Sequence, residues 1–420
     1  MKYRISHPTK KLNGSIELTA SKSESNRALI IQALCREKFV IDNLATAKDT
    51  MVLQQVLQSA QTAAFETVYD VGASGTAMRF LTAYFATQPG THILTGSDRM
   101  KNRPIGVLVQ ALWDLGADIE YLEEDGFPPL KITGRVLKDA EIEMDGNVSS
   151  QFVSALLMIS PELPNGLVIR FKGEITSRPY VNMTLKMMEE FRVYGQWHDD
   201  CISVSNQQYH KKSEPLYLFQ VEADWSSASY WYAIAALAEE ADFTIKGLKN
   251  PSLQGDSIVS SLFSFFGVKT EVLPEGIHLT KIKSEKVHFG FDFSDCPDLA
   301  QTLAVVTSAL NIPSLFNGVH TLRIKETDRI IALQKELKKL NIEVNVLNDN
   351  SIEIKPQPIT NNVDSSISIE TYDDHRMAMA FATLAMKLDS ITIENPEVVE
   401  KSYPAFWDDL KSVGFQIDEL

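Results

Sequence analysis

The sequence predicts an α/β fold built from repeated units, and three observations support this prediction. Short stretches in which polar and apolar residues alternate, such as residues 3–6 and 14–18, are typical of strands. Six polar turns each run directly into an apolar stretch of helical length. The chain has 420 residues, 44% of them hydrophobic, which is ample for large cores and long for a single one. We therefore expect two domains that mix strands and helices.

Charge and cysteine content exclude several classes of protein. The net charge of −15 and the pI of about 5.1 argue against nucleic acid or an anionic membrane as a partner. The three cysteines, Cys35, Cys201 and Cys296, are far apart and odd in number, which favours reduced thiols over a disulfide framework or a metal site. No apolar signal region opens the chain, and no apolar run approaches the roughly 18–20 residues that span a bilayer. We expect a cytoplasmic protein.

An internal repeat is visible in the six polar turns. After a first gap of about 50 residues, the turns recur roughly every 72–76 residues, as in a repeat architecture. The turns are residues 20–27, 72–79, 147–151, 223–229, 295–298 and 372–376. In the first turn, Ser21 and Glu24 have the spacing of a capping box. Units of about 70 residues have room for two helices and several short strands.

A second helix is expected in each unit. The six candidates are residues 49–57, 104–115, 179–194, 256–266, 328–340 and 403–413. The change between the two halves of the chain falls near residues 220–224. If the N-terminal strands complete the second half, the chain crosses between domains twice, near Ala20 and near Glu222.

The stretch Lys325-Glu326-Thr327-Asp328-Arg329 carries the strongest functional signal. It stands directly before an apolar periodic run, so Thr327 or Asp328 can cap a helix that begins there. Lys325, Glu326 and Arg329 then cluster at the positive end of that helix, which favours an anionic ligand. The alternative is a capped helix whose charged start is only solvated.

The other turns repeat this chemistry. Their cations, hydroxyls and glycine are the groups that phosphate and carboxylate ligands need. They include Lys22, Ser23, Arg27, Gly75, Arg79, Arg103, Ser149, Ser150, Ser177, Arg376 and Lys401. Two acids, Asp298 and Glu326, stand at such turns, where one can take a proton and the other can give one. Asp373-Asp374-His375-Arg376 has no second His or Cys at ligand spacing, so no metal site is expected.

Together these stretches resemble a known family. The matching segments include Ser21-Lys22-Ser23, Gly75-Thr76-Ala77-Met78-Arg79, Arg103-Pro104-Ile105, Ser149-Ser150-Gln151-Phe152, Ser177-Arg178-Pro179-Tyr180, Pro297-Asp298, residues 325–329, Asp374-His375-Arg376-Met377-Ala378 and Lys401-Ser402-Tyr403-Pro404. They span essentially the whole chain and closely resemble the 5-enolpyruvylshikimate-3-phosphate (EPSP) synthase family, within the enolpyruvyl transferases.

The resemblance implies a fold and a reaction. The fold is two similar domains of three βαβαββ-type repeats each, an inside-out α/β barrel, with residues 21–222 in one domain, residues 1–20 plus 223–420 in the other, and the active site in the cleft between them. The reaction joins phosphoenolpyruvate to the 5-hydroxyl of shikimate 3-phosphate through a tetrahedral intermediate and releases phosphate. It implies no metal and no other cofactor. We expect a monomer that serves chorismate and aromatic amino acid biosynthesis.

The resemblance also implies residue roles. Asp298 takes the hydroxyl proton, Glu326 protonates the methylene carbon of phosphoenolpyruvate, and Lys22 touches both substrates and shares in proton transfer. Shikimate 3-phosphate is bound by Lys22, Ser23, Arg27, Ser149, Ser150, Gln151, Ser177, Asp298, Thr321 and Lys325. Phosphoenolpyruvate is bound by Lys22, Gly75, Arg103, Gln151, Arg329, Arg376 and Lys401. Two positions depart from the family pattern: Thr321 replaces the Asn of many members, and Phe80 replaces their Pro.

Two rival functions have discriminating features. UDP-N-acetylglucosamine enolpyruvyl transferases resemble this chain in fold and chemistry, but they usually carry a Cys in the loop before the Arg matched by Arg103. Here that loop, residues 96–102, contains no Cys. A non-catalytic anion-binding protein gains nothing from acids that face its ligand, so Asp298 and Glu326 argue against it.

Overall fold

The computed structural model describes residues 1–62, 66–138, 140–212, 217–284, 287–359 and 367–420. They form two compact units: unit 1 comprises Met1–Ala20 and Glu222–Leu420, and unit 2 comprises Ser21–Val221. Each unit has its own hydrophobic core. Glu222 lies in unit 1, where its carboxylate accepts hydrogen bonds from Trp225 Nε1 and Lys249 N, both at 2.7 Å.

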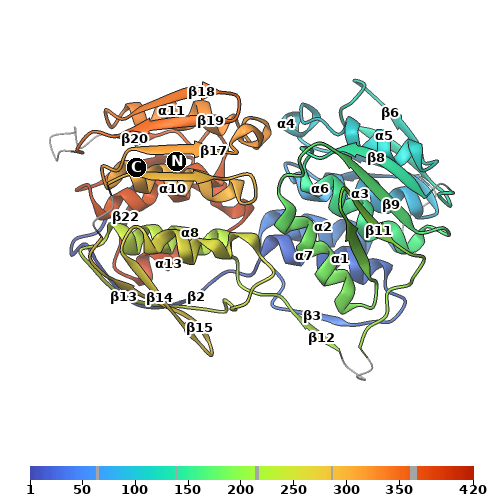
Figure 1. Cartoon of the computed structure of the whole chain (residues 1–420), viewed down its shortest axis with the longest axis horizontal. Helices are drawn as coiled ribbons and strands as arrows, with labels where there is room; N and C mark the ends of the chain where they lie inside the picture. The colour runs from blue at the N-terminus through green and yellow to red at the C-terminus, as the bar shows by residue number, and fades with distance from the viewer. Residues whose placement is uncertain (63–65, 139, 213–216, 285–286, 360–366) are drawn as a thin grey trace. The chain divides into compact units, whose positions relative to one another are not determined.

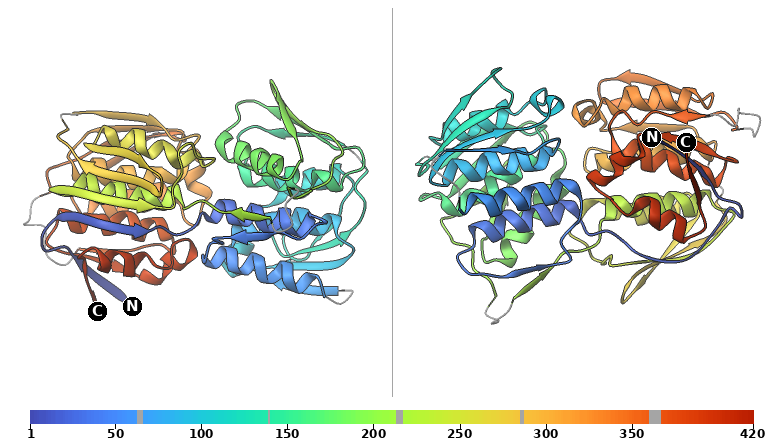
Figure 2. Two further views of the ribbon diagram at one scale, coloured as in Figure 1. Left: turned by 90° about the horizontal axis from the view of Figure 1, so that it is seen from below. Right: turned by 180° about the vertical axis from the view of Figure 1, so that it is seen from behind.

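Unit 1 builds three four-stranded sheets from its described residues, with orders β14-β15-β13-β2, β16-β17-β19-β18 and β20-β21-β1-β22. One parallel pair in each sheet, β2/β13, β16/β17 or β20/β21, is extended by antiparallel strands. The strands are β1 (Lys2–Ser6), β2 (Lys11–Glu17), β13 (Glu240–Lys246), β14 (Val268–Leu273), β15 (Gly276–Lys281), β16 (Phe289–Asp292), β17 (Ser314–Asn317), β18 (Glu343–Asn348), β19 (Ser351–Lys355), β20 (Ser368–Ile369), β21 (Ile391–Glu394) and β22 (Gln416–Glu419). Because β1 pairs with both β21 and β22, the two chain ends lie side by side (Figure 2).

Unit 2 repeats this topology twice, in sheets β4-β5-β7-β6 and β10-β11-β9-β8. Its remaining described sheet is only the parallel pair β12-β3. The strands are β3 (Val40–Asp42), β4 (Glu66–Asp70), β5 (Gly90–Thr95), β6 (Asp118–Tyr121), β7 (Leu130–Gly134), β8 (Glu141–Asp145), β9 (Leu167–Lys172), β10 (Gly195–His198), β11 (Cys201–Val204) and β12 (Leu218–Gln220). The first repeat is shorter than the others: helix α2 ends at Ala60 and β4 begins at Glu66.

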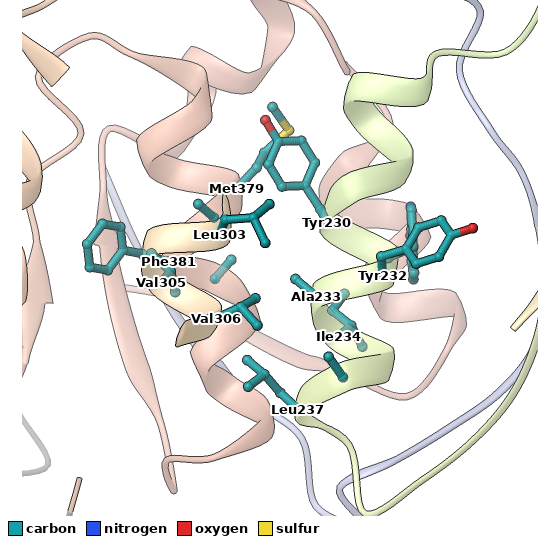
Figure 3. Close-up of a cluster of buried hydrophobic side chains, with 14 of the residues drawn as sticks. Tyr230, Tyr232, Ala233, Ile234, Leu237, Leu303, Val305, Val306, Met379 and Phe381 are labelled. Carbon is teal, nitrogen blue, oxygen red and sulfur yellow. The ribbon is translucent and has the colours of Figure 1, made fainter. Parts of the chain in front are cut away.

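The centre of each unit is a set of three buried helices. In unit 1 these are α8 (Trp225–Leu237), α10 (Ala300–Ala309) and α12 (His375–Ala382), and in unit 2 they are α1 (Lys22–Leu34), α3 (Gly75–Thr87) and α6 (Ser150–Ile159). Every residue of α12 is buried, as is every residue of α8 except Ser226. Such helices are apolar on all sides because other helices and sheets surround them. Figure 3 shows Ala233, Leu303 and Phe381 among the side chains of this core in unit 1.

A second helix follows in each repeat, as the sequence predicts (Figure 1). These helices are α2 (Lys48–Ala60), α5 (Gly106–Asp114), α7 (Arg178–Glu190), α9 (Val259–Ser264), α11 (Arg329–Lys338) and α13 (Phe406–Ser412). Their bounds differ from the expected ranges by a few residues, as is usual for helix ends. The α/β prediction, with buried helices inside and sheets outside, is confirmed. No helix in the described ranges has the length and apolar character needed to cross a membrane.

Candidate functional site

Several of the predicted site residues lie at the N-termini of the inner helices. In unit 1, Asp224 caps α8 by accepting from Ser227 N at 3.0 Å, and Asp374 caps α12 by accepting from Arg376 N at 2.9 Å. The short 3₁₀ helix η3 (Pro297–Leu299), which contains Asp298, leads into α10. Because the three inner helices pack together, their starts bring distant parts of the sequence to one place.

Asp298 lies among three cations. Its Oδ1 is 3.0 Å from Arg329 Nη1 and 3.7 Å from Lys325 Nζ, and its Oδ2 is 2.7 Å from Arg376 Nη2. Burial alone raises the pKa of this carboxyl, but Arg376, Lys325 and Arg329 outweigh burial and hold the pKa well below its usual range. Asp298 is therefore ionised at neutral pH, the state that a proton acceptor needs.

Arg329 joins Asp298 to the second predicted catalytic acid. Its Nη2 donates to Glu326 Oε2 at 2.9 Å and its Nε to Asp374 Oδ2 at 2.7 Å. The side chain is only 1% exposed, and although burial lowers the pKa of a guanidinium, the carboxylates of Asp374, Glu326 and Asp298 raise it above its ordinary value. Lys401 Nζ lies 2.9 Å from Glu326 Oε1. Unit 1 thus brings together Asp298, Glu326, Lys325, Arg329, Arg376 and Lys401.

Asp328 is the residue that caps α11. Its Oδ1 accepts from Ile330 N and Ile331 N, both at 3.1 Å, so the cap is Asp328 rather than Thr327. Thr321 lies in the preceding 3₁₀ helix η4 (His320–Ile324). Its buried hydroxyl has no hydrogen-bond partner in the described part of the chain. The predicted contact of Thr321 with shikimate 3-phosphate stays a prediction.

Serines cap all three inner helices of unit 2. The hydroxyls of Ser21, Ser74 and Ser149 accept from backbone N–H groups of the first turn at 3.3–3.4 Å. The cap at Ser21 confirms the serine half of the expected capping box. Lys22, the first residue of α1, places its Nζ 3.2 Å from Asp49 Oδ2. The helix starts in unit 2 therefore present N–H groups and a cation, as an anion site requires.

Gly75 opens α3 beside two arginines. A Cβ at this position would lie 2.5 Å from Arg79 Nη1 and 2.6 Å from Arg103 Nη1, so a side chain would displace both guanidinium groups. Gln151, in the first turn of α6, accepts from Arg79 Nη1 at 3.0 Å and donates to Thr76 Oγ1 at 3.2 Å. Unit 2 thus collects the predicted phosphoenolpyruvate ligands Gly75, Arg103 and Gln151 at neighbouring helix starts.

Arg27 occupies an internal position. The side chain is nearly fully buried, with Nε 2.7 Å from Thr184 Oγ1, Nη2 3.0 Å from Ser154 Oγ and Nη1 2.9 Å from Ser23 O. Burial lowers the pKa of Arg27 to about 10. These contacts join α1 to α6 and α7. Nearby, Ser150 begins α6, and Ser177, with φ of 53°, precedes α7. The ligand contacts expected of Ser23, Arg27, Ser150 and Ser177 stay predictions.

Sequence reasoning missed several residues of these clusters. Asp256, which is 2% exposed, accepts from Ser226 Oγ, and burial together with the charge of Asp298 raises the pKa of Asp256 to about 7. Tyr230 Oη accepts from Arg376 Nη1 at 3.4 Å. Asp49, paired with Lys22, was missed as well. Asp49 and Asp256 are each the first residue of a predicted second helix, but the spacing of helices along the sequence does not show which charged side chains these acids contact.

Comparisons with known proteins point to one family. A family model described as "EPSP synthase (3-phosphoshikimate 1-carboxyvinyltransferase)" matches residues 6–410. A protein of Bacteroides fragilis named 3-phosphoshikimate 1-carboxyvinyltransferase is 48% identical over 418 residues, 99% of each chain. A protein of Photobacterium profundum with the same name is 35% identical over 430 residues, 97% of this chain and 98% of that protein.

Solved structures of the same architecture are similar along their whole length. An EPSP synthase from Acinetobacter baumannii superposes with a TM-score of 0.77 at 21% identity, covering 100% of both chains. The enolpyruvyl transferase NikO from Streptomyces tendae has a TM-score of 0.73 at 14% identity, covering 99% of this chain and 98% of that one. At these identities the likeness concerns the fold alone, and it agrees with the enolpyruvyl transferase fold expected from the sequence.

Proposed function

This chain belongs to the EPSP synthase family, and we propose from that membership that it transfers the enolpyruvyl group of phosphoenolpyruvate to the 5-hydroxyl of shikimate 3-phosphate. The products are 5-enolpyruvylshikimate 3-phosphate and inorganic phosphate, on the route to chorismate and the aromatic amino acids. The observation that carries the proposal is that the guanidinium of Arg329 bonds both Asp298 and Glu326, the two acids to which the proposal assigns opposite proton transfers.

The two acids have complementary parts in the proposed addition. Asp298, held ionised by its cations, accepts the proton of the 5-hydroxyl while that oxygen bonds to C2 of phosphoenolpyruvate. Glu326 gives a proton to the methylene carbon C3, which completes the tetrahedral intermediate. In the elimination, the Glu326 carboxylate takes a proton back from C3 and the C2–O bond to phosphate breaks, which restores the enol ether double bond and releases phosphate.

Cations and helix starts hold the charges of both substrates in this proposal. In unit 1 the proposed ligands of phosphoenolpyruvate are Arg329, Arg376 and Lys401, and fixed positive groups such as these stabilise the charge that develops in the intermediate. The unit 2 ligands are Lys22, Gly75, Arg103 and Gln151. The ligands of shikimate 3-phosphate are Lys22, Ser23, Arg27, Ser149, Ser150, Gln151, Ser177, Asp298, Thr321 and Lys325.

Three further properties belong to the proposal. The enzyme needs neither metal nor organic cofactor, because its own cations neutralise the substrates. It acts as a monomer, since one chain supplies every assigned residue. It resides in the cytoplasm, where free thiols such as those of Cys35, Cys201 and Cys296 stay reduced.

Phosphate release from phosphoenolpyruvate tests the proposal. The assay is run in the presence of a metal chelator, with shikimate 3-phosphate, with UDP-N-acetylglucosamine or with no acceptor. We expect release only with shikimate 3-phosphate. Release that depends on UDP-N-acetylglucosamine would assign the chain to the rival transferase, and no release with either acceptor from a folded sample would refute enolpyruvyl transfer to both.

A further inference from the structure

The segment before α12 contains two consecutive residues in the left-handed conformation. Tyr372 has φ of 53° and Asp373 has φ of 55°. Residues with a Cβ rarely adopt such backbone angles, bulky ones especially, and these conformations persist only where the surrounding structure holds them. The chain then continues directly into Asp374, which caps α12, and Arg376. The contacts that hold Tyr372 and Asp373 in place therefore also set the positions of Asp374 and Arg376.

A buried carboxylate on α11 makes the contacts that hold this segment. Glu336 is 0% exposed, and its Oε1 accepts from Tyr372 Oη at 2.7 Å. Its Oε2 accepts from Glu370 N at 3.1 Å and from Lys339 Nζ at 2.5 Å. Lys339 Nζ also donates to Ser368 O at 2.8 Å. A charged acceptor with three donors is strongly bound, so Glu336 attaches the segment to α11 at several points.

The same helix holds the segment at a second place. Arg329, the first residue of α11, donates through Nε to Asp374 Oδ2 at 2.7 Å. Glu336 follows Arg329 by about two helical turns, so both side chains leave the same side of α11. Arg329 and Arg376 both bond Asp298, at 3.0 and 2.7 Å. The distance between the guanidinium groups of Arg329 and Arg376 therefore depends on the contacts between α11 and the segment before α12.

We propose that Glu336 and Tyr372 are positioning residues for phosphoenolpyruvate. Their hydrogen bond locks the left-handed segment against α11 and so sets the distance between the guanidinium groups of Arg329 and Arg376, while neither residue touches the substrate. The ligand part of this inference rests on the proposed function. Burial and the charge of Glu336 raise the pKa of Tyr372 above its ordinary value, so its hydroxyl keeps the proton that it donates.

Two variants and a matched control test the proposal. Tyr372→Phe removes the donated hydrogen bond, and Glu336→Gln leaves only one of the two acceptor oxygens. We expect the KM for phosphoenolpyruvate to rise about tenfold in Tyr372→Phe, because misplacing a binding group by a fraction of an ångström is costly, while the KM for shikimate 3-phosphate changes less than twofold. Glu336→Gln is also expected to raise the KM for phosphoenolpyruvate. The control, Tyr217→Phe, removes the similar hydrogen bond from Tyr217 Oη to Glu190 in unit 2 and leaves both constants unchanged.

Amide hydrogen exchange separates this inference from the proposed function. Measured without substrates, the Arg376 amide, which donates to Asp374 Oδ1 at 2.9 Å, is expected to exchange about tenfold faster in Tyr372→Phe than in the parent chain or in the control. Unchanged exchange together with an unchanged KM for phosphoenolpyruvate in both variants would overturn the positioning role. A parent chain that releases no phosphate would refute the proposed function. Amide exchange would still show whether the hydrogen bond between Tyr372 and Glu336 holds the segment before α12 in place.

Discussion

One guanidinium, that of Arg329, bonds the carboxylates of Asp374, Asp298 and Glu326. Glu326 stands three residues before Arg329, so the sequence alone predicted that these two charges meet. Asp298 and Asp374 are separated from Arg329 by 31 and 45 residues. Helix packing determines contacts between residues so far apart along the chain, and neither composition nor spacing in the sequence predicts them. The position of Asp298 at a polar turn singled it out in the sequence, and the family resemblance supplied its role as proton acceptor.

At the scale of single residues, we expect Asp298→Asn and Glu326→Gln each to lower turnover by about 10²-fold or more, the usual contribution of a general acid or base. Both variants retain the shape of the side chain and the surrounding cations, so shikimate 3-phosphate should still bind. The measurement is phosphate release from folded protein. Asp295→Asn, which removes an exposed charge from the same turn, serves as the control. Turnover near that of the parent chain in both variants would refute the two role assignments.

Asp256 provides a prediction about stability and pH. Its folded-state pKa of about 7 lies above the ordinary value of 3.8 because of burial and the charge of Asp298. Because the pKa of Asp256 is raised, the folded state binds this proton more tightly than the unfolded state does. The stabilisation that results is fully present below pH 3.8 and is lost as pH rises through about 7. The shift corresponds to at most about 4 kcal/mol.

Asp256→Asn removes this titration. Denaturant unfolding at pH 4.5 and pH 8 is expected to show that the variant becomes more stable relative to the parent chain as pH rises. The groups facing Asp256, namely Asp298, Asp224, Arg376 and Cys296, are unchanged in the variant. A free-energy difference between the two proteins that is the same at both pH values would contradict the raised pKa.

At the scale of helices and strands, the sequence predicted what depends on local chemistry. Ser21 is an N-cap as expected, and Ser149 caps α6 in the same way, since a hydroxyl before an apolar run satisfies free N–H groups wherever it occurs. The 3₁₀ start at residues 297–299 was not predicted, and neither was the two-stranded sheet β12-β3, which is smaller than the other sheets of the described residues. The ends of helices and the number of strands in a sheet depend on packing and pairing with other elements of the fold, which local propensity does not determine.

The start of α3 gives a test at this scale. Gly75→Ala places a Cβ within 2.6 Å of the guanidinium nitrogens of Arg79 and Arg103, so both side chains must move. We expect the KM for phosphoenolpyruvate to rise about tenfold or more, with the KM for shikimate 3-phosphate nearly unchanged and the fold retained, because long flexible side chains can yield. Ala73→Ser, at an exposed position of the same turn, is the control. An unchanged KM for phosphoenolpyruvate in Gly75→Ala would argue against Gly75 and Arg103 as its ligands.

At the scale of the whole molecule, the chain leaves unit 1 after Ala20, builds unit 2 and returns at Glu222. Alternating residues predicted the two N-terminal strands, but the register of β1 between β21 and β22 is a long-range property that the sequence did not reveal. Each unit presents helix starts with anion-binding groups, and unit 1 adds the two acids. The proposed function therefore requires ligands of phosphoenolpyruvate from each of the two units.

The most direct test of that requirement removes one cation from each unit. Arg103→Ala changes unit 2 and Lys401→Ala changes unit 1, and the KM for phosphoenolpyruvate is measured at saturating shikimate 3-phosphate. If Arg103 and Lys401 are both ligands, each variant alone should raise this KM by about tenfold or more, the loss expected for a charge-assisted contact. A KM that rises in only one variant, with both proteins folded, would contradict this assignment, because the residue changed in the other variant would then make no contribution to binding phosphoenolpyruvate.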